Sequence, residues 1–230
     1  MTPNGLILFL ITYLSINSQT LGNGVTDIEG TFYNTVIIGT QEWTKQNLNT
    51  SHYRNGDIIP QVTDLKQWSN LTTGAWCYYN NDTQNGTVYG KLYNWYAVND
   101  PRGLAPKNWS IPSQTDWVGL DSYLGGFEAG NKMKEEGVSH WSKSGGNNES
   151  GFTGIPGGRI SINQSETSII FHDINEYGVW WSTTSNPSNN YPYYIFLLSC
   201  CPSTIITTGY KNYGFSVRCL KNRVDGSARN

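Results

Sequence analysis

Charged side chains are scarce in this chain of 230 residues, where Asp, Glu, Lys and Arg together make up only 14%. The 15 basic and 17 acidic residues nearly cancel, and Lys and Arg form no cluster along the chain. Proteins that bind nucleic acid or an anionic membrane by charge carry a basic patch or stripe. We therefore expect no nucleic-acid partner. A long coiled coil is excluded as well, because such chains are rich in Ala, Glu, Lys and Leu.

Cysteine is also scarce, and none of the four cysteines belongs to a Cys-x-x-Cys pair. That spacing is typical of zinc ribbons and of thioredoxin-like redox sites, so neither is predicted. Three ways of pairing four cysteines are formally open. Adjacent cysteines bridge each other with difficulty, because the ring they close strains the peptide between them. The four are Cys77, Cys200, Cys201 and Cys219; if a bond forms, we favour Cys219 with Cys200 or Cys201.

Short motifs of catalytic and metal sites are missing. The sequence contains neither Gly-x-Ser-x-Gly nor His-Glu-x-x-His. The oxygen-rich stretch from Asn81 fails as an EF-hand loop, because its twelfth position is Leu92, where a bidentate Glu is required. The three histidines share no spacing on one helix face, which indicates partly exposed loop residues: His52, His140 and His172. We predict no metal, no cofactor and no enzymatic activity.

The longest hydrophobic run lies near the N-terminus, at Leu6–Ile16, and counts only eleven residues. A helix of that length is too short to cross a bilayer. The run is followed by the small and polar residues NSQT, which favours a secretory signal processed near Ser18 or Thr20. The alternative is a buried N-terminal strand or helix. We expect residues 1–20 to be a signal peptide, the protein to be secreted or held at the cell surface, and no transmembrane segment.

Glycine and aromatic residues are abundant instead, with 25 Gly, nine Trp and fifteen Tyr, which indicates a loop-rich domain. Thr31–Ile38 is rich in β-branched and aromatic residues and predicts a strand. Asn55-Gly56 lies between strand formers and predicts a hairpin, and Asn85-Gly86 predicts a polar turn between two aromatic segments. From Ile169 onward the pattern indicates short strands and turns.

The best helix signal follows residue 112. Ser113 can cap a helix, Asp116 completes a capping-box pair, and Gly125-Gly126 ends the segment. The apolar face at helical spacing consists of Trp117, Leu120 and Leu124. A weaker signal covers Ala129–Glu136. We predict one α+β domain over residues 21–222, with a flexible C-terminal tail at 223–230.

Seven segments of the chain resemble, in order, those of the Fibrobacter succinogenes major paralogous domain, a family of exported and surface proteins. They are VIIGTQEWTKQNL (36–48), QVTD (61–64), YGKLYNWYAV (89–98), NWSIPSQTDW (108–117), SGFTGIPGGR (150–159), YGVWWSTT (177–184) and GFSVRC (214–219). The resemblance covers about Asp27 to Lys221. It implies a C-type-lectin-like α+β fold, with short twisted antiparallel sheets, paired N- and C-terminal strands, and long loops at one end that carry a binding surface.

The chain departs from the patterns of this family and its relatives at three points. Ala105 stands where the family commonly has Cys, which leaves a family disulfide at that position in doubt. Asn186-Pro187-Ser188 is the nearest match to the calcium-binding triplets of sugar-binding lectins, so calcium-dependent sugar binding is not implied. The cysteines also differ from the spaced catalytic pair of formylglycine-generating enzymes.

The candidate site lies between the framework words at Trp180–Ser182 and Gly214–Cys219. Its Tyr side chains offer large contact area with few rotatable bonds, and its Asn side chains supply adaptable hydrogen bonds. The candidate ligand-binding residues are Asn189, Asn190, Tyr191, Tyr193, Tyr194, Tyr210, Asn212 and Tyr213. The opposing interpretation makes Tyr193–Ser199 a core strand, with Ile195 and Leu197 on one face and Phe196 and Leu198 on the other.

Three hypotheses about function follow. The leading one is an exported module that recognises a protein or glycan through these loops. The second is a structural or matrix protein that self-associates through the same aromatic surface. The remote third is an enzyme of the formylglycine-generating type.

Overall fold

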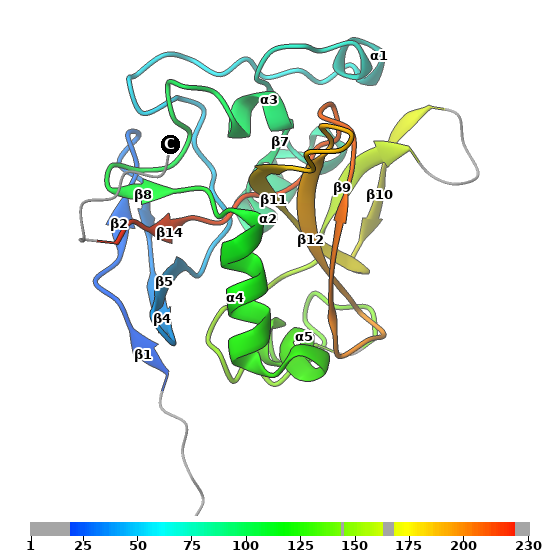
Figure 1. The fold of residues 1–230 in the computed structure, drawn as a ribbon. Coiled ribbons are helices and arrows are strands. Elements are labelled where there is room, and N and C mark those ends of the chain that lie inside the picture. Colours follow the sequence, from blue (N-terminus) through cyan, green and yellow to red (C-terminus); the bar gives the residue numbers. More distant parts are fainter. Residues whose placement is uncertain (1–18, 144, 163–167, 224–230) are drawn as a thin grey trace, which may run out of the picture.

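The computed structural model describes residues 19–143, 145–162 and 168–223, and it confirms an α+β fold with several small antiparallel sheets (Figure 1). The largest sheet contains strands from both ends of the described chain, since β14 pairs with β5 and β8. Its strand order is β1 (Thr20–Leu21), β4 (Thr35–Ile38), β5 (Gln41–Thr44), β14 (Leu220–Lys221) and β8 (Trp109–Ser110).

A second, three-stranded sheet lies within the C-terminal third of the chain. It consists of β11 (Tyr177–Ser185), β12 (Pro192–Leu198) and β13 (Thr204–Thr208), all antiparallel. The remaining strands form three two-stranded pairs: β9 (Gly157–Ile162) with β10 (Ile169–Ile174), β6 (Trp76–Cys77) with β7 (Leu92–Tyr93), and β2 (Val25–Thr26) with β3 (Phe32–Tyr33).

The helices are short and alternate with the strands along the chain. They are α1 (Leu65–Ser69), α2 (Thr83–Tyr89), α3 (Trp95–Val98), α4 (Gln114–Leu124) and α5 (Ala129–Met133), with 3-10 turns at Tyr79–Asn81 and Gly126–Glu128. Among the described residues, no helix combines the length and the apolar character needed to cross a membrane.

Helix α4 confirms the strongest helix prediction. The Ser113 hydroxyl accepts from the Asp116 N–H, and the Asp116 carboxylate accepts from the Ser113 N–H at 2.9 Å, which completes the capping box. Gly125 ends the helix in the left-handed region, with φ 99°. The predicted apolar face, Trp117, Leu120 and Leu124, is buried.

Tryptophan rings join the two large sheets through α4. Trp43 on β5, Trp117 on α4 and Trp180 on β11 are at most 1% exposed. The ring centroids of Trp43 and Trp117 lie 4.7 Å apart, and those of Trp117 and Trp180 lie 6.4 Å apart. In Figure 1, α4 accordingly stands between the sheet that carries β5 and the strands β11 and β12.

Two turn predictions need correction. Asn85-Gly86 is wrong as a turn, because both residues lie inside α2, which the Asp82 side chain caps through the Gln84 N–H at 2.8 Å. Asn55-Gly56 does form a tight turn, with Gly56 at φ 92°, but the hairpin reduces to a single bridge between His52 and Ile58.

Other predicted elements differ mainly in length. The strand expected over Thr31–Ile38 is broken at Asn34 into β3 and β4. The weaker helix signal over Ala129–Glu136 ends early, because the backbone turns extended at Lys134, with ψ 146°. Residues 1–18 of the expected signal peptide and residues 224–230 of the expected tail lie outside the described residues.

Candidate functional site

The first loop of the candidate site joins β11 to β12. The Asn190 N–H donates to the Asn186 carbonyl, and the Asn186 N–H donates to the Tyr191 carbonyl, both at 2.8 Å. Asn190 has φ 57°, a left-handed conformation that Asn adopts more readily than most residues. The Asn189 side chain accepts from the Tyr191 N–H at 3.0 Å. These bonds fix the turn while Asn189 and Asn190 remain exposed.

The second loop follows β13 and is tied to the end of α1. The Asn212 amide donates to the Ser69 carbonyl at 2.7 Å, and the Asn212 carbonyl accepts from the Trp68 indole at 2.7 Å. The Tyr213 N–H donates to the Tyr210 carbonyl at 3.0 Å. Loop residues 210–213 therefore hold one course beside α1.

A groove of about 430 Å³ lies between these two loops. We call it the Tyr191–Tyr210 groove; it is lined by residues 69–72, Tyr96, 189–191 and 210–212. The rings of Tyr191 and Tyr210 meet edge to face, with centroids 5.1 Å apart, and remain 39% and 46% exposed. Within the described chain, the hydroxyls of Tyr96, Tyr191 and Tyr210 make no hydrogen bond. The groove thus offers phenol hydroxyls and amides beside two exposed rings.

The structure brings most of the candidate residues together. Five of the eight line the groove: Asn189, Asn190, Tyr191, Tyr210 and Asn212. Tyr193 is half-buried on β12. Tyr213 is half-buried too, and its ring packs 5.4 Å from Tyr210 and 5.9 Å from Phe215.

Tyr194 occupies a different position, inside the core. It is only 8% exposed, and its ring centroid lies 4.6 Å from Phe215 and 6.1 Å from Trp181. Burial raises the pKa of Tyr194. The strand interpretation of this stretch therefore holds as well, since Ile195 and Leu197 are fully buried on the other face. Tyr194 therefore packs in the core, and its exposed area is too small to contribute much to ligand binding.

The framework segments at Trp180–Ser182 and Gly214–Cys219 lie on either side of the groove loops in the sequence. A family model described as the Fibrobacter succinogenes major domain matches residues 36–221, which includes α1, α3, β11–β13 and the whole Tyr191–Tyr210 groove. The chain belongs to this family. No curated protein matches the sequence, and no solved structure matches it. The C-type-lectin-like architecture of the Fibrobacter succinogenes major domain therefore stays a prediction for this chain.

All four cysteines are free, so the favoured pairing of Cys219 with Cys200 or Cys201 is wrong. Cys219 is 0% exposed in the core, whereas Cys200 and Cys201 follow β12 near the surface. The sulfur atoms of Cys200 and Cys201 lie 2.7 Å apart. Burial raises the pKa of the Cys219 thiol to about 12.

Each histidine contacts a carboxylate, which the sequence did not indicate. His52 Nδ1 lies 2.6 Å from Glu29, His140 Nδ1 lies 2.6 Å from Glu135, and His172 Nδ1 lies 2.9 Å from Asp173. Glu29 lies 23 positions from His52 along the chain, whereas Glu135 and Asp173 lie five positions and one position from their histidines. No group of three or more His, Cys, Asp or Glu suited to a metal ion occurs among the described residues.

The His172–Asp173 pair also contacts a serine, and the resulting Ser–His–Asp sequence of contacts is the one found in serine hydrolases. Ser161 Oγ lies 2.6 Å from His172 Nε2, and His172 Nδ1 contacts Asp173. Ser161 is only 3% exposed, and the contacted Asp173 oxygen also accepts from Arg159 Nε at 2.8 Å. A nucleophile needs room for the substrate atom it attacks. We interpret the cluster as a polar tie between β9 and β10.

Proposed function

We propose that this protein is an exported ligand-binding module that recognises a surface protein or glycan through the Tyr191–Tyr210 groove. The observation that carries the proposal is the pair of exposed, mutually packed tyrosine rings in a groove rimmed by amides. Loops on a rigid scaffold are the usual place for such recognition.

The chemistry of the groove suits adaptable recognition better than catalysis. Tyrosine buries much area on binding at a low entropic cost, and its hydroxyl both donates and accepts hydrogen bonds. Three phenol hydroxyls in the groove are unpaired within the described chain, so they are available to a ligand. Lys211 is the basic residue of the groove, and its ammonium lies 5.1 Å above the Trp95 ring. A mainly neutral, amphipathic partner surface fits these groups.

Alanine variants of the two exposed rings test the proposal. Biotinylated wild-type protein, Tyr191→Ala and Tyr210→Ala would be applied to a printed glycan array and to an array of purified bacterial and host surface proteins. We expect spots that bind wild type to lose signal at least about tenfold with each variant, the loss of a contact worth about 1.4 kcal/mol. Tyr123→Ala is the matched control, because Tyr123 is 65% exposed on α4, outside the groove.

Two outcomes would contradict the proposal. Binding retained by both groove variants would place recognition elsewhere on the molecule. Sedimentation of wild type at increasing concentration tests the alternative of self-assembly. A concentration-dependent oligomer that Tyr191→Ala abolishes would favour a structural or matrix role, whereas a constant monomer agrees with a binding module.

A further inference from the structure

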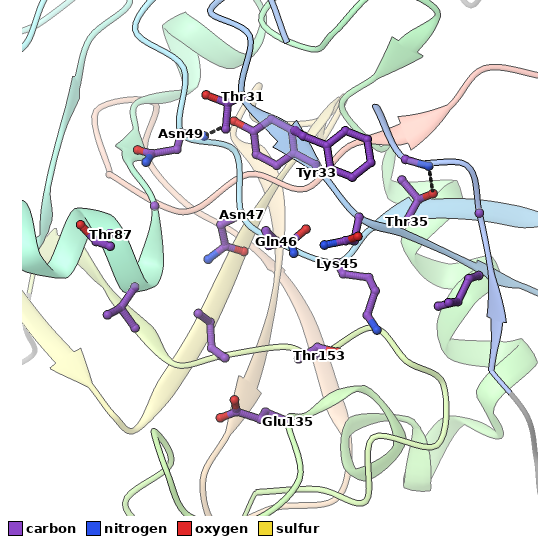
Figure 2. A pocket seen from close by; sticks show the side chains of 18 of the residues that line it. Thr31, Tyr33, Thr35, Lys45, Gln46, Asn47, Asn49, Thr87, Glu135 and Thr153 are labelled. Carbon is purple, nitrogen blue, oxygen red and sulfur yellow. Dashed lines mark hydrogen bonds between the residues drawn. The ribbon is translucent and has the colours of Figure 1, made fainter. Parts of the chain in front are cut away.

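A second and larger cleft, of about 680 Å³, lies apart from the Tyr191–Tyr210 groove and shares no lining residue with it. Its walls come from residues 21–24, the strand region 31–35, residues 45–47 and 49, and the end of α2 (Figure 2). We call it the Thr31–Gln46 cleft. Its volume lies within the range of small-molecule sites, about 300–1,000 Å³.

Neutral polar groups line this cleft without partners of their own. The side chains of Asn34, Gln46 and Thr31 make no hydrogen bond within the described chain, and all three residues are exposed. Amides and hydroxyls each offer both a donor and an acceptor. Figure 2 shows Thr31 and Gln46 on the same side of the cleft as Lys45, with Glu135 on the opposite side.

An apolar surface stands beside these polar groups. Phe32 is 57% exposed and Val88 is 46% exposed, and both line the cleft. The tip of the Phe32 ring lies against Gly24, where a Cβ would come within 2.1 Å of the Phe32 Cζ atom. Gly24 has φ +75°, so glycine supplies both the space and the backbone conformation that hold the ring in place.

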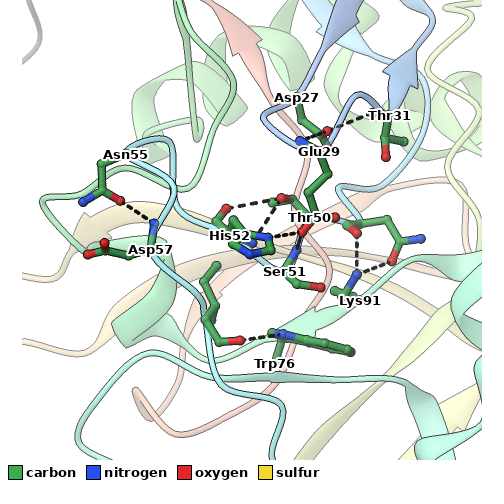
Figure 3. A network of polar contacts seen from close by, with 12 residues as sticks. Asp27, Glu29, Thr31, Thr50, Ser51, His52, Asn55, Asp57, Trp76 and Lys91 are labelled. Atoms are coloured by element: carbon green, nitrogen blue, oxygen red, sulfur yellow. Dashed lines mark hydrogen bonds and ion pairs between the residues drawn. The ribbon is translucent and has the colours of Figure 1, made fainter.

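A buried polar network fixes the wall that carries Thr31 (Figure 3). Asp27 is 8% exposed, and its Oδ1 accepts from the N–H groups of Glu29 and Thr31, each at 2.9 Å. Its Oδ2 accepts from the Tyr33 hydroxyl at 2.8 Å. The Tyr33 oxygen in turn accepts from the Asn49 N–H at 3.0 Å. The loop residues of the cleft are therefore held in one geometry before any ligand arrives.

Lys91 supports the same wall from the far side. It is 3% exposed, its ammonium donates to the Asn49 carbonyl and, at 3.2 Å, to Asn49 Oδ1, and it lies 4.4 Å above the Trp76 ring. Burial lowers the pKa of Lys91, while the carboxylates of Glu29 and Asp27 act in the opposite direction. The charge is used to hold Asn49 and is not presented to the cleft.

We propose that the Thr31–Gln46 cleft binds a neutral oligosaccharide. A sugar ring presents hydroxyls that donate and accept, which match the free amides and hydroxyls, and an apolar C–H face, which matches the exposed Phe32 ring. A phosphorylated ligand would need several cations, and Lys45 is the single Lys or Arg in the described lining, opposed by Glu135. A metal-bridged ligand would need a carboxylate cluster, which the described residues do not form.

The cleft lies partly outside the family match, since Gln46 and the end of α2 fall within residues 36–221 but one wall does not. Residues 21–35 precede the matched region, which begins at residue 36, and they supply Phe32, Thr31 and Asn34. Because the two clefts share no lining residue, this inference does not rest on the function proposed for the Tyr191–Tyr210 groove, and either proposal can fail while the other stands.

Two-dimensional ¹H–¹⁵N NMR of the protein tests the site. Maltotetraose, cellotetraose and laminaritetraose would be titrated to 10 mM, with tetragalacturonate as the anionic comparison. We expect at least one neutral tetrasaccharide to shift the amides of residues 31–35 and 45–49 in a saturable way. Phe32→Ala and Gln46→Ala should each raise the dissociation constant at least about fivefold, because each removes one of the two complementary surfaces.

Controls separate this site from the other and from general effects. Tyr123→Ala, which lines neither cleft, should leave the titration unchanged, and the spectra of the variants show whether they fold. Shifts confined to residues 189–191 and 210–212 would move sugar binding to the other groove and overturn this inference. Shifts caused by tetragalacturonate alone would overturn the neutral class, and a panel without saturable shifts would overturn the sugar site.

Discussion

Asn47 and Arg218 meet in the centre of the core, where Arg218 Nε donates a hydrogen bond of 2.7 Å to Asn47 Oδ1 across 171 positions of sequence. The same oxygen accepts from the Trp180 indole at 2.8 Å, and the Asn47 amide donates to the Tyr89 carbonyl at 2.8 Å. Asn47 also lines the Thr31–Gln46 cleft, and Trp180 belongs to the strand that leads to the Tyr191–Tyr210 groove. One pair of side chains thus positions the supports of both candidate sites.

Replacing Arg218 should destabilise the fold strongly. Its guanidinium donates to the carbonyls of Thr44, Phe152 and Thr153 at 2.8–3.0 Å, and Arg218→Met would leave these acceptors buried without a donor. Each unsatisfied buried group costs about 1–3 kcal/mol, so we expect a loss of more than ~3 kcal/mol in the free energy of unfolding, measured in urea. Arg102→Met is the control, because Arg102 is exposed and solvent screens its ion pairs with Asp57 and Asp100. An Arg218 variant as stable as this control would contradict the prediction.

Alanine variants of Tyr194 and Tyr210 should differ in their loss of stability, because one ring is buried and the other is exposed. Tyr194→Ala removes a ring that is 8% exposed and packed on Phe215, so we expect about 3 kcal/mol of lost stability. Tyr210→Ala removes a ring that is 46% exposed and should change stability by less than about 1 kcal/mol. Chemical denaturation of both variants measures the difference. Equal losses would mean that the exposed ring serves the core as well.

Asp173 should make the β9–β10 hairpin sensitive to acid. Burial raises the pKa of Asp173, but the hydrogen bond from His172 and the positive charge of Arg159 outweigh it, so the pKa is lowered below its usual 3.8. A carboxyl with a lowered folded pKa contributes stability that is fully present above its unfolded pKa and is lost as the pH falls through the folded value.

The Asp173→Asn variant tests this contribution, since Asn tolerates the φ of 65° at this position. We expect wild type to be more stable than the variant by about 1 kcal/mol at pH 6, with the difference shrinking once the pH falls below about 4. Urea unfolding at several pH values measures it. Glu136→Gln, at an exposed position, should show no such trend; a difference for Asp173 that stays constant with pH would count against the ion-pair explanation.

The cysteines should divide into two reactive and two protected thiols. Cys200 is exposed and Cys201 partly exposed, whereas Cys77 and Cys219 are 0% exposed. Burial raises the pKa of both buried thiols, which lowers the thiolate fraction that reacts. Intact mass after iodoacetamide treatment should show two adducts in native protein and four in guanidinium. Adducts on Cys77 or Cys219 in the native state would contradict the burial.

Local signals in the sequence were sufficient where one segment carried everything that the structure needed. Helix α4 has its cap, its apolar spacing and its glycine stop within residues 113–125. Asn85-Gly86 failed because the glycine serves packing and not φ: a Cβ at Gly86 would lie 2.2 Å from the Tyr78 ring, inside a helix capped by Asp82. A turn signal and a close-packed helical glycine look identical in sequence.

The candidate site was likewise predicted only in part. The Asn- and Tyr-rich composition identified the two loops, and five of eight residues line one groove. Tyr194 could not be assigned from sequence, because β12 packs both of its faces, with Ile195 on one side and Tyr194 on the other. The Thr31–Gln46 cleft joins segments that lie far apart in the sequence, and the Ser161–His172 contact depends on the register in which β9 and β10 pair; neither can be read from a local pattern.

The ties of the second loop have a consequence for how this protein can change. The Trp68 indole donates a hydrogen bond to the carbonyl of residue 212, and the main-chain N–H of Trp95 donates to the carbonyl of residue 211 at 2.9 Å. The course of the loop is therefore set largely through main-chain oxygens. The turn before β12 is likewise closed by the carbonyls of Asn186 and Tyr191. The outward-facing rings of Tyr191 and Tyr210 are thus separate from the bonds that shape the loops, whereas the side-chain amides of Asn189 and Asn212 belong to those bonds. The two exposed tyrosines can therefore be exchanged for other residues while the frame beneath them stays the same.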